Sequence, residues 1–112
     1  MTDERDASAA EESTSFRANH SQGNRAVGGR IVLTSTHLVF TAHALDRRTG
    51  GRDLTIPLSN VRVASEGGRS LAGGLFSGGL RRRLVIELED GSSEAFVVSR
   101  VEDRVAAVNS LL

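Results

Sequence analysis

One stretch restricts the possible folds of this chain more than any other: Gly28 to Phe40, with the sequence GGRIVLTSTHLVF. Two apolar segments, Ile31–Leu33 and Leu38–Phe40, flank four polar residues. β-Branched and aromatic runs on either side of turn-forming residues are typical of a β-hairpin. We therefore expect two paired strands here.

The β pattern continues on both sides of this hairpin. Strands are expected over Ser15–His20, Arg25–Thr34, His37–Ala44, Arg52–Ile56, Arg82–Leu88 and Glu94–Val98, with further β signal from Ile56 to Val63. Asp46–Gly51 reads as a polar connection. Pro57 lacks a backbone donor, so we expect it at a strand edge, a strand start or a bulge.

The turn at Asp90 and Gly91 leaves two possible strand registers. A two-residue turn would place Glu87 opposite Glu94, which is an unfavourable pair of like charges. A three-residue bulged turn would instead place Leu84 opposite Phe96 and keep both side chains inside. The sequence favours the bulged turn.

The chain after the last strand predicts an amphipathic helix. Ser99 and Glu102 have the spacing of a capping box. Apolar residues then recur on one face of a helix that runs to the end of the sequence, at Val101, Val105, Val108 and Leu112.

Length and charge indicate one small domain preceded by an acidic arm. The chain has 112 residues, which suits a single domain with a modest core. Residues 1–14 are acidic and rich in alanine and serine, with too little apolar surface to offset the entropy cost of ordering, so we expect them to be disordered, with the domain over residues 15–112. Because the chain has no lysine, every basic side chain except histidine is a guanidinium group, which suits phosphate or carboxylate.

The sequence also limits where the protein is expected to work. It has no cysteine, which excludes disulfides, thiolate zinc sites and cysteine nucleophiles. The acidic start is unlike a signal peptide, and no apolar run approaches the roughly 20 residues of a membrane span. We expect a cytoplasmic protein, either free or peripheral at the inner face of the membrane.

Several of these segments together resemble the GRAM domain, a member of the pleckstrin-homology-like superfamily. The similarity covers about Ser15–Leu112 and is carried by the Gly28–Phe40 hairpin, Ile56–Val61, the Leu88–Gly91 turn and Phe96–Val98. It implies a mainly β fold: a barrel of two near-orthogonal antiparallel sheets, about seven strands in all, with a C-terminal helix. It also implies a non-catalytic binding role, as in stand-alone bacterial proteins of this type.

The resemblance makes two groups of arginines candidates for binding anionic lipid. Basic residues near strand ends of such domains often gather lipid headgroups, and the corresponding residues here are Arg47, Arg48, Arg52, Arg81, Arg82 and Arg83. The alternative is that these arginines are solvating charges that protect sheet edges.

Residues 67–79 contain six glycines and carry Leu75 and Phe76. These two side chains are candidates for contact with a membrane or a protein partner. They could equally fold back over the barrel or form a short strand. The segment lacks the Lys-Ser/Thr that completes a phosphate-binding P-loop, so nucleotide binding is rejected.

The sequence offers no pattern for catalysis, a cofactor or a metal. Its histidines, His20, His37 and His43, are interpreted as scattered residues on polar faces rather than converging ligands. No carboxylate pair or Ser/His/Asp spacing stands out, so we expect no enzyme. Nucleic acid is an unlikely partner because stacking aromatics are few.

Two binding roles follow as hypotheses. The first is peripheral binding to an anionic lipid or membrane surface through the arginines. The second is protein interaction or self-association through a free sheet edge, without lipid. The acidic arm could fold over the arginines and compete with an anionic partner.

Overall fold

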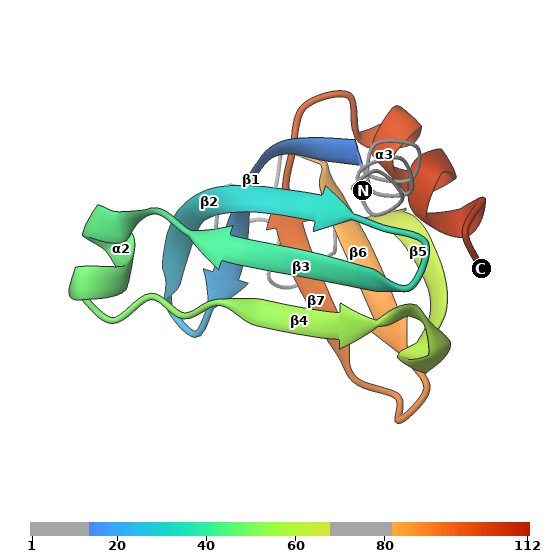
Figure 1. The fold of residues 1–112 in the computed structure, drawn as a ribbon, viewed down its shortest axis with the longest axis horizontal. Helices are drawn as coiled ribbons and strands as arrows, with labels where there is room; N and C mark the ends of the chain where they lie inside the picture. Colours follow the sequence, from blue (N-terminus) through green and yellow to red (C-terminus); the bar gives the residue numbers. More distant parts are fainter. Residues whose placement is uncertain (1–13, 68–81) are drawn as a thin grey trace, which may run out of the picture.

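The computed structural model describes residues 14–67 and 82–112 (Figure 1). In this part of the chain, seven strands pair in the order β4-β3-β2-β1-β7-β6-β5, and every pair is antiparallel. The elements are β1 Thr14–Gln22, β2 Arg25–Leu33, β3 His37–Ala42, α2 Ala44–Arg48, β4 Leu54–Pro57, the 3-10 turn η1 Leu58–Asn60, β5 Val61–Gly67, β6 Arg83–Leu88, β7 Ser93–Val97 and α3 Val101–Asn109.

Backbone pairing joins the strands into one continuous sheet, while β2, β3 and β4 run across β6 and β7 in the view of Figure 1. The link between the two groups of strands is short. β1 pairs with β2 along its whole length but with β7 only at Asn19–Val97 and His20–Phe96. A division into two near-orthogonal sheets stays a prediction. The arm expected over residues 1–14 lies outside the described residues except for Thr14.

The hairpin expected from the sequence is present as β2 and β3. Ile31 pairs with Phe40, and Leu33 pairs with Leu38, so their side chains share the inner face. All four are buried. The alternation in β3 therefore follows directly from the strand period of two.

The β6–β7 hairpin has the bulged-turn register. Leu84 lies opposite Phe96, and Glu87 lies opposite Ser93 rather than Glu94. Gly91 has φ +93°, a left-handed conformation that favours glycine. Asp90 accepts hydrogen bonds from the Ser92 hydroxyl and backbone N–H, which lower the pKa of its carboxyl.

The segment from α2 to β5 agrees with one expectation from the sequence and departs from two others. Pro57 ends β4, an edge strand, as its missing donor requires. The polar connection expected over Asp46–Gly51 instead begins as the short helix α2. The β signal between Ile56 and Val63 is interrupted by η1 before β5 starts.

The helix start predicted at Ser99 was wrong. The N-cap of α3 is Arg100, which adopts φ 53° and ψ 51° and makes no side-chain cap bond. The apolar stripe is only partly confirmed: Val108 is fully buried, but Leu112 lies beyond the end of the helix and is 50% exposed. A capping box needs extended backbone at the cap, which a left-handed Arg100 does not provide.

Candidate functional site: a basic cleft beside the β1–β7 junction

A cleft of about 620 Å³ opens where β1 and β7 stop pairing. Beyond the Asn19–Val97 pair, the segments 17–18 and 98–99 separate, and both line the cleft. Gly28 and Gly29 of β2 line another wall. The opening therefore comes from the shortness of the β1–β7 ladder.

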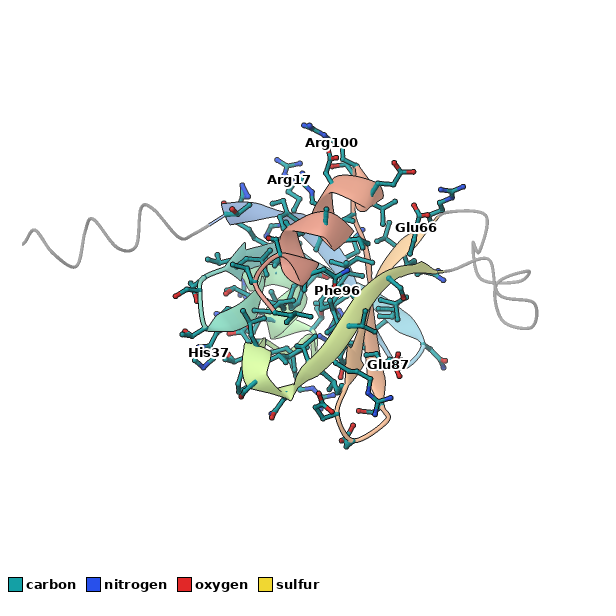
Figure 2. The ribbon with its side chains drawn as sticks, turned by 90° about the vertical axis from the view of Figure 1, so that its right-hand side faces the viewer. Arg17, His37, Glu66, Glu87, Phe96 and Arg100 are labelled. Atoms are coloured by element: carbon teal, nitrogen blue, oxygen red, sulfur yellow. The ribbon has the colours of Figure 1, made fainter. Side chains whose placement is uncertain are left out.

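Arginines from separate elements meet at this cleft. Arg17 comes from β1, Arg82 directly precedes β6, and Arg100 directly precedes α3. Figure 2 shows Arg17 and Arg100 extending from the same end of the molecule. Polar groups of Asn19 and His43 complete the lining. This arrangement offers guanidinium groups to one ligand from different directions.

The positive charges of the cleft are only partly neutralised by neighbouring carboxylates. Arg82 Nη1 lies 3.0 Å from Glu66 Oε2 and 4.0 Å from Glu102 Oε2. Arg100 Nε donates to Asp103 Oδ2 at 3.0 Å. These pairs are solvent-exposed, so exchanging a carboxylate for another anion costs about 1 kcal/mol or less.

Arg17 has no carboxylate partner among the described residues. Its neighbour across the β1–β2 ladder is Arg30, which likewise makes no ion pair in the part of the chain that is described. Like charges directly opposite each other destabilise a sheet, by up to about 1 kcal/mol. An anion bound beside the two guanidinium groups would reduce this repulsion.

Arg100 carries backbone strain at the cleft. It is the one non-glycine residue with positive φ in residues 14–67 and 82–112. A left-handed conformation costs a residue with a Cβ roughly 1–2 kcal/mol. Strained residues concentrate at binding sites, where the surrounding structure holds the side chain in position.

The arginines predicted from the sequence fall into two groups. Arg82 lines the cleft and Arg83 begins β6, where it is half-buried. Arg47 and Arg48 lie on α2, and Arg52 follows it, outside the cleft lining. Three other candidates lie outside the described residues: Leu75, Phe76 and Arg81.

Arg47 is held by the connection between β3 and β4. Its Nη2 donates to both carboxylate oxygens of Asp53, at 3.1 and 3.2 Å, and to the backbone oxygen of Ala42 at 3.2 Å. Asp53 also accepts from the Ala42 N–H at 2.8 Å. This backbone bond, with Arg47 beside it, holds the pKa of Asp53 below its ordinary value of 3.8.

The lowered pKa of Asp53 predicts a pH-dependent contribution to stability. Asp53→Asn should lower the free energy of unfolding at neutral pH, because the charged carboxylate is favoured by folding. The gap to wild type should shrink as the pH falls below 3.8, where the wild-type carboxylate also loses its charge. Urea unfolding over a pH series measures this. Asp103→Asn, in an exposed pair, should show almost no gap, and a gap for Asp53→Asn that acid leaves unchanged would refute the assignment.

The interpretation of the histidines was wrong for His20, which is buried and 5% exposed. Its ring stacks on Phe96 with centroids 4.6 Å apart and lies 5.3 Å from Phe40. His20 Nε2 is 2.7 Å from Glu94 Oε1, and Gln22 Nε2 donates to His20 Nδ1 at 2.9 Å. The sequence could not show this burial because Glu94 lies 74 residues away.

The orientation of Gln22 selects the tautomer of His20. The Gln22 carboxamide donates to the Arg52 carbonyl at 2.8 Å and accepts from the Arg52 N–H at 3.0 Å. Both bonds fix the amide nitrogen on the side of His20 Nδ1. His20 therefore carries its proton on Nε2 and donates it to Glu94. The network joins β1, β7 and the β3–β4 connection.

Two further findings concern the part of the chain that is described. No group of three histidine or carboxylate side chains there is placed to hold a metal ion. Within the same residues, no helix is long and apolar enough to cross a membrane.

Comparison with solved structures shows what this fold resembles. The C-terminal domain of an unknown protein from Leishmania infantum superposes with a TM-score of 0.65 and 12% identity, over 88% of this chain and 80% of that chain. The Vps36 N-terminal PH domain superposes with a TM-score of 0.55 and 14% identity, over 90% of this chain and 83% of that chain. The fold is pleckstrin-homology-like. No family model and no curated protein matches the sequence.

Within this fold, sequence reasoning missed Arg17 and Arg100 as members of the cleft. Neither could have been found from the sequence. Arg17 joins the cleft through the separation of β1 from β7, and the place of Arg100 depends also on an unusual backbone angle.

Proposed function

We propose that this chain is a GRAM-like, non-catalytic module that binds phosphate groups of an anionic membrane surface through its basic cleft. The observation that carries this proposal is the meeting of Arg17, Arg82 and Arg100 at one opening. Each guanidinium group can donate two parallel hydrogen bonds to a phosphate. In this reading the protein is peripheral at the inner face of the membrane.

The charges around the cleft support binding without a rearrangement of the fold. Arg17 and Arg30 form a like-charge pair that an anion would relieve, and the partners of Arg82 and Arg100 are exposed carboxylates. Each basic side chain near an anionic leaflet contributes about 1 kcal/mol. The three arginines together would then change membrane partition on the order of a hundred-fold.

Liposome co-sedimentation tests the proposal. Wild-type protein should pellet with vesicles containing phosphatidylserine but not with vesicles of pure phosphatidylcholine. Salt at 1 M should abolish pelleting, because it shortens the Debye screening length to about 3 Å. Changing Arg17, Arg82 and Arg100 together to alanine should abolish pelleting. The matched control is Arg62→Ala on β5, an exposed arginine outside the cleft.

Other outcomes point to other surfaces. A second triple variant has Arg47, Arg48 and Arg52 changed to alanine. If this variant no longer pellets while the cleft variant still does, the binding surface is at α2. If the wild-type protein fails to pellet with acidic vesicles at low salt, the lipid proposal is refuted. Protein interaction then becomes the leading function.

Two substitutions at Arg100 separate the contribution of its side chain to vesicle binding from the effect of its backbone strain on stability. Arg100→Ala and Arg100→Gly both remove the guanidinium group and should weaken vesicle binding equally, by about five-fold. Glycine adopts the left-handed conformation freely, so Arg100→Gly should be about 1 kcal/mol more stable than Arg100→Ala. Urea unfolding and co-sedimentation of the two variants measure both effects. Equal stability of the two variants would show that the backbone is not strained in solution.

A further inference from the structure

One part of the basic cleft is lined by polar residues other than arginine. Asn19, Gly28 and His43 form this part of the lining, and we call them the polar corner. Asn19 lies opposite Gly28 in the β1–β2 ladder. The backbone N–H of His43, between β3 and α2, donates to the Gly28 carbonyl at 2.9 Å (Figure 1). Gly28 is therefore the residue beside which the other two are held.

The side chains of the polar corner converge above the α-carbon of Gly28. A Cβ at Gly28 would lie 3.3 Å from Asn19 Oδ1 and from His43 Cδ2, and 3.2 Å from Asp46 Oδ2. Polar groups from β1, from α2 and from the residue before α2 thus surround the place where Gly28 has no side chain. A ligand group that enters above Gly28 comes within reach of Asn19 and His43.

The polar corner suits uncharged hydroxyl groups. Neither the Asn19 carboxamide nor the His43 ring makes a hydrogen bond to another of the described residues, and both residues are exposed. A carboxamide and a neutral imidazole can each donate and accept, as a hydroxyl can. The nearby Asp46 accepts the Gly28 N–H at 3.2 Å and lies 3.5 Å from Arg25 Nη2, which offsets its charge. A charged ligand group would lose more hydration here than a hydroxyl would.

We propose that the basic cleft binds a phosphate group that carries glycerol, with the phosphate at the arginines and the glycerol hydroxyls at the polar corner. The proposal rests on the function proposed above and identifies its lipid as phosphatidylglycerol rather than phosphatidylserine. These two headgroups have the same net charge, so the arginines alone do not distinguish them. The cleft volume of about 620 Å³ is in the range of pockets that hold small ligands, which leaves room for the glycerol beyond the phosphate.

Co-sedimentation with two kinds of vesicle tests the proposal. Each kind contains phosphatidylcholine and the same mole fraction of either phosphatidylglycerol or phosphatidylserine, so that the surface charge is equal. Wild-type protein should bind the vesicles with phosphatidylglycerol about ten-fold more tightly, a ratio that two net hydrogen bonds can supply. Circular dichroism checks that each variant in the comparison is folded.

Variants of the polar corner should lose this preference. Changing Asn19 and His43 together to alanine removes the side chains that would meet the hydroxyls, so the ratio of the two affinities should fall to about one. Gly28→Ala keeps both side chains but fills the space between them, and it should lower the ratio as well. The matched control is Asn24→Ala in the exposed β1–β2 turn, which should keep the wild-type ratio. A preference that the double variant retains would overturn the proposal.

Free ligands distinguish a lipid headgroup from a soluble glycerol phosphate. NMR titration of the wild-type protein should show tighter binding of glycerol 3-phosphate than of inorganic phosphate. If the protein pellets equally with both kinds of vesicle, this proposal is overturned while the proposed function stands. If neither vesicle binds but glycerol 3-phosphate is still preferred, the polar corner is supported and the membrane function is refuted. Equal affinity for the two free phosphates, in a protein that pellets with neither vesicle, overturns both.

Discussion

Gly29→Ala is expected to destabilise the fold by about 3 kcal/mol or more, the largest single effect that the structure predicts. A Cβ at this position would lie 2.2 Å from the Thr41 carbonyl oxygen and 2.7 Å from Cζ of Phe40. The first of these atoms belongs to the backbone of β3, so it cannot move without disturbing the β2–β3 ladder. The second belongs to a fully buried ring.

The adjacent glycine provides a matched control. The three atoms nearest to a Cβ at Gly28 would be side-chain atoms of Asp46, Asn19 and His43, at 3.2–3.3 Å. These side chains can shift, so Gly28→Ala should cost less than about 1 kcal/mol. Urea unfolding followed by circular dichroism measures both variants. If the two variants are equally stable, the protein in solution does not have the close approach of β2 and β3 at Gly29 on which this prediction depends.

His20→Ala is expected to destabilise the protein by about 3 kcal/mol, in the range of other buried aromatic truncations. The change removes a ring that lies against both Phe40 and Phe96. It also leaves Glu94 without its 2.7 Å hydrogen bond. In a domain of this size, such a loss lowers the melting temperature by roughly 12 °C or more.

Two variants separate packing from hydrogen bonding at this site. His20→Phe keeps an aromatic ring between Phe40 and Phe96 but loses both side-chain bonds, so it should recover only part of the stability. His43→Ala, at an exposed position, should change the free energy of unfolding by less than about 0.5 kcal/mol. Thermal unfolding of all three variants decides this. A His20→Ala protein as stable as His43→Ala would contradict the buried network.

Local patterns in the sequence predicted much of the sheet. The alternation of Leu38, Phe40 and Ala42 follows from the strand period, and the register of Leu84 with Phe96 follows from avoiding a Glu87–Glu94 pair. Both depend on residues close together in the chain. The same holds for Pro57, whose missing donor confines it to a sheet edge.

The features that sequence reasoning missed depend on contacts between distant residues. His20 is polar by type, and only its contacts with Glu94 and Phe96 make a buried position favourable. Arg100 took the place of Ser99 at the helix start because the backbone there is left-handed, a state that arginine rarely adopts by itself. Of the candidate arginines, Arg82 was predicted, whereas Arg17 and Arg100 join it only through the separation of β1 from β7.

The short β1–β7 ladder also bears on how the chain folds. β1 to β4 form one meander of consecutive antiparallel strands, and β5 to β7 form another, so nearly all strand pairing joins neighbours in sequence. Such local pairs form early, because closing a short loop loses little chain entropy. Among residues 14–67 and 82–112, the pairs Asn19–Val97 and His20–Phe96 are the one ladder that must bring remote segments together. We therefore expect the closing of this junction to be the slow step of folding.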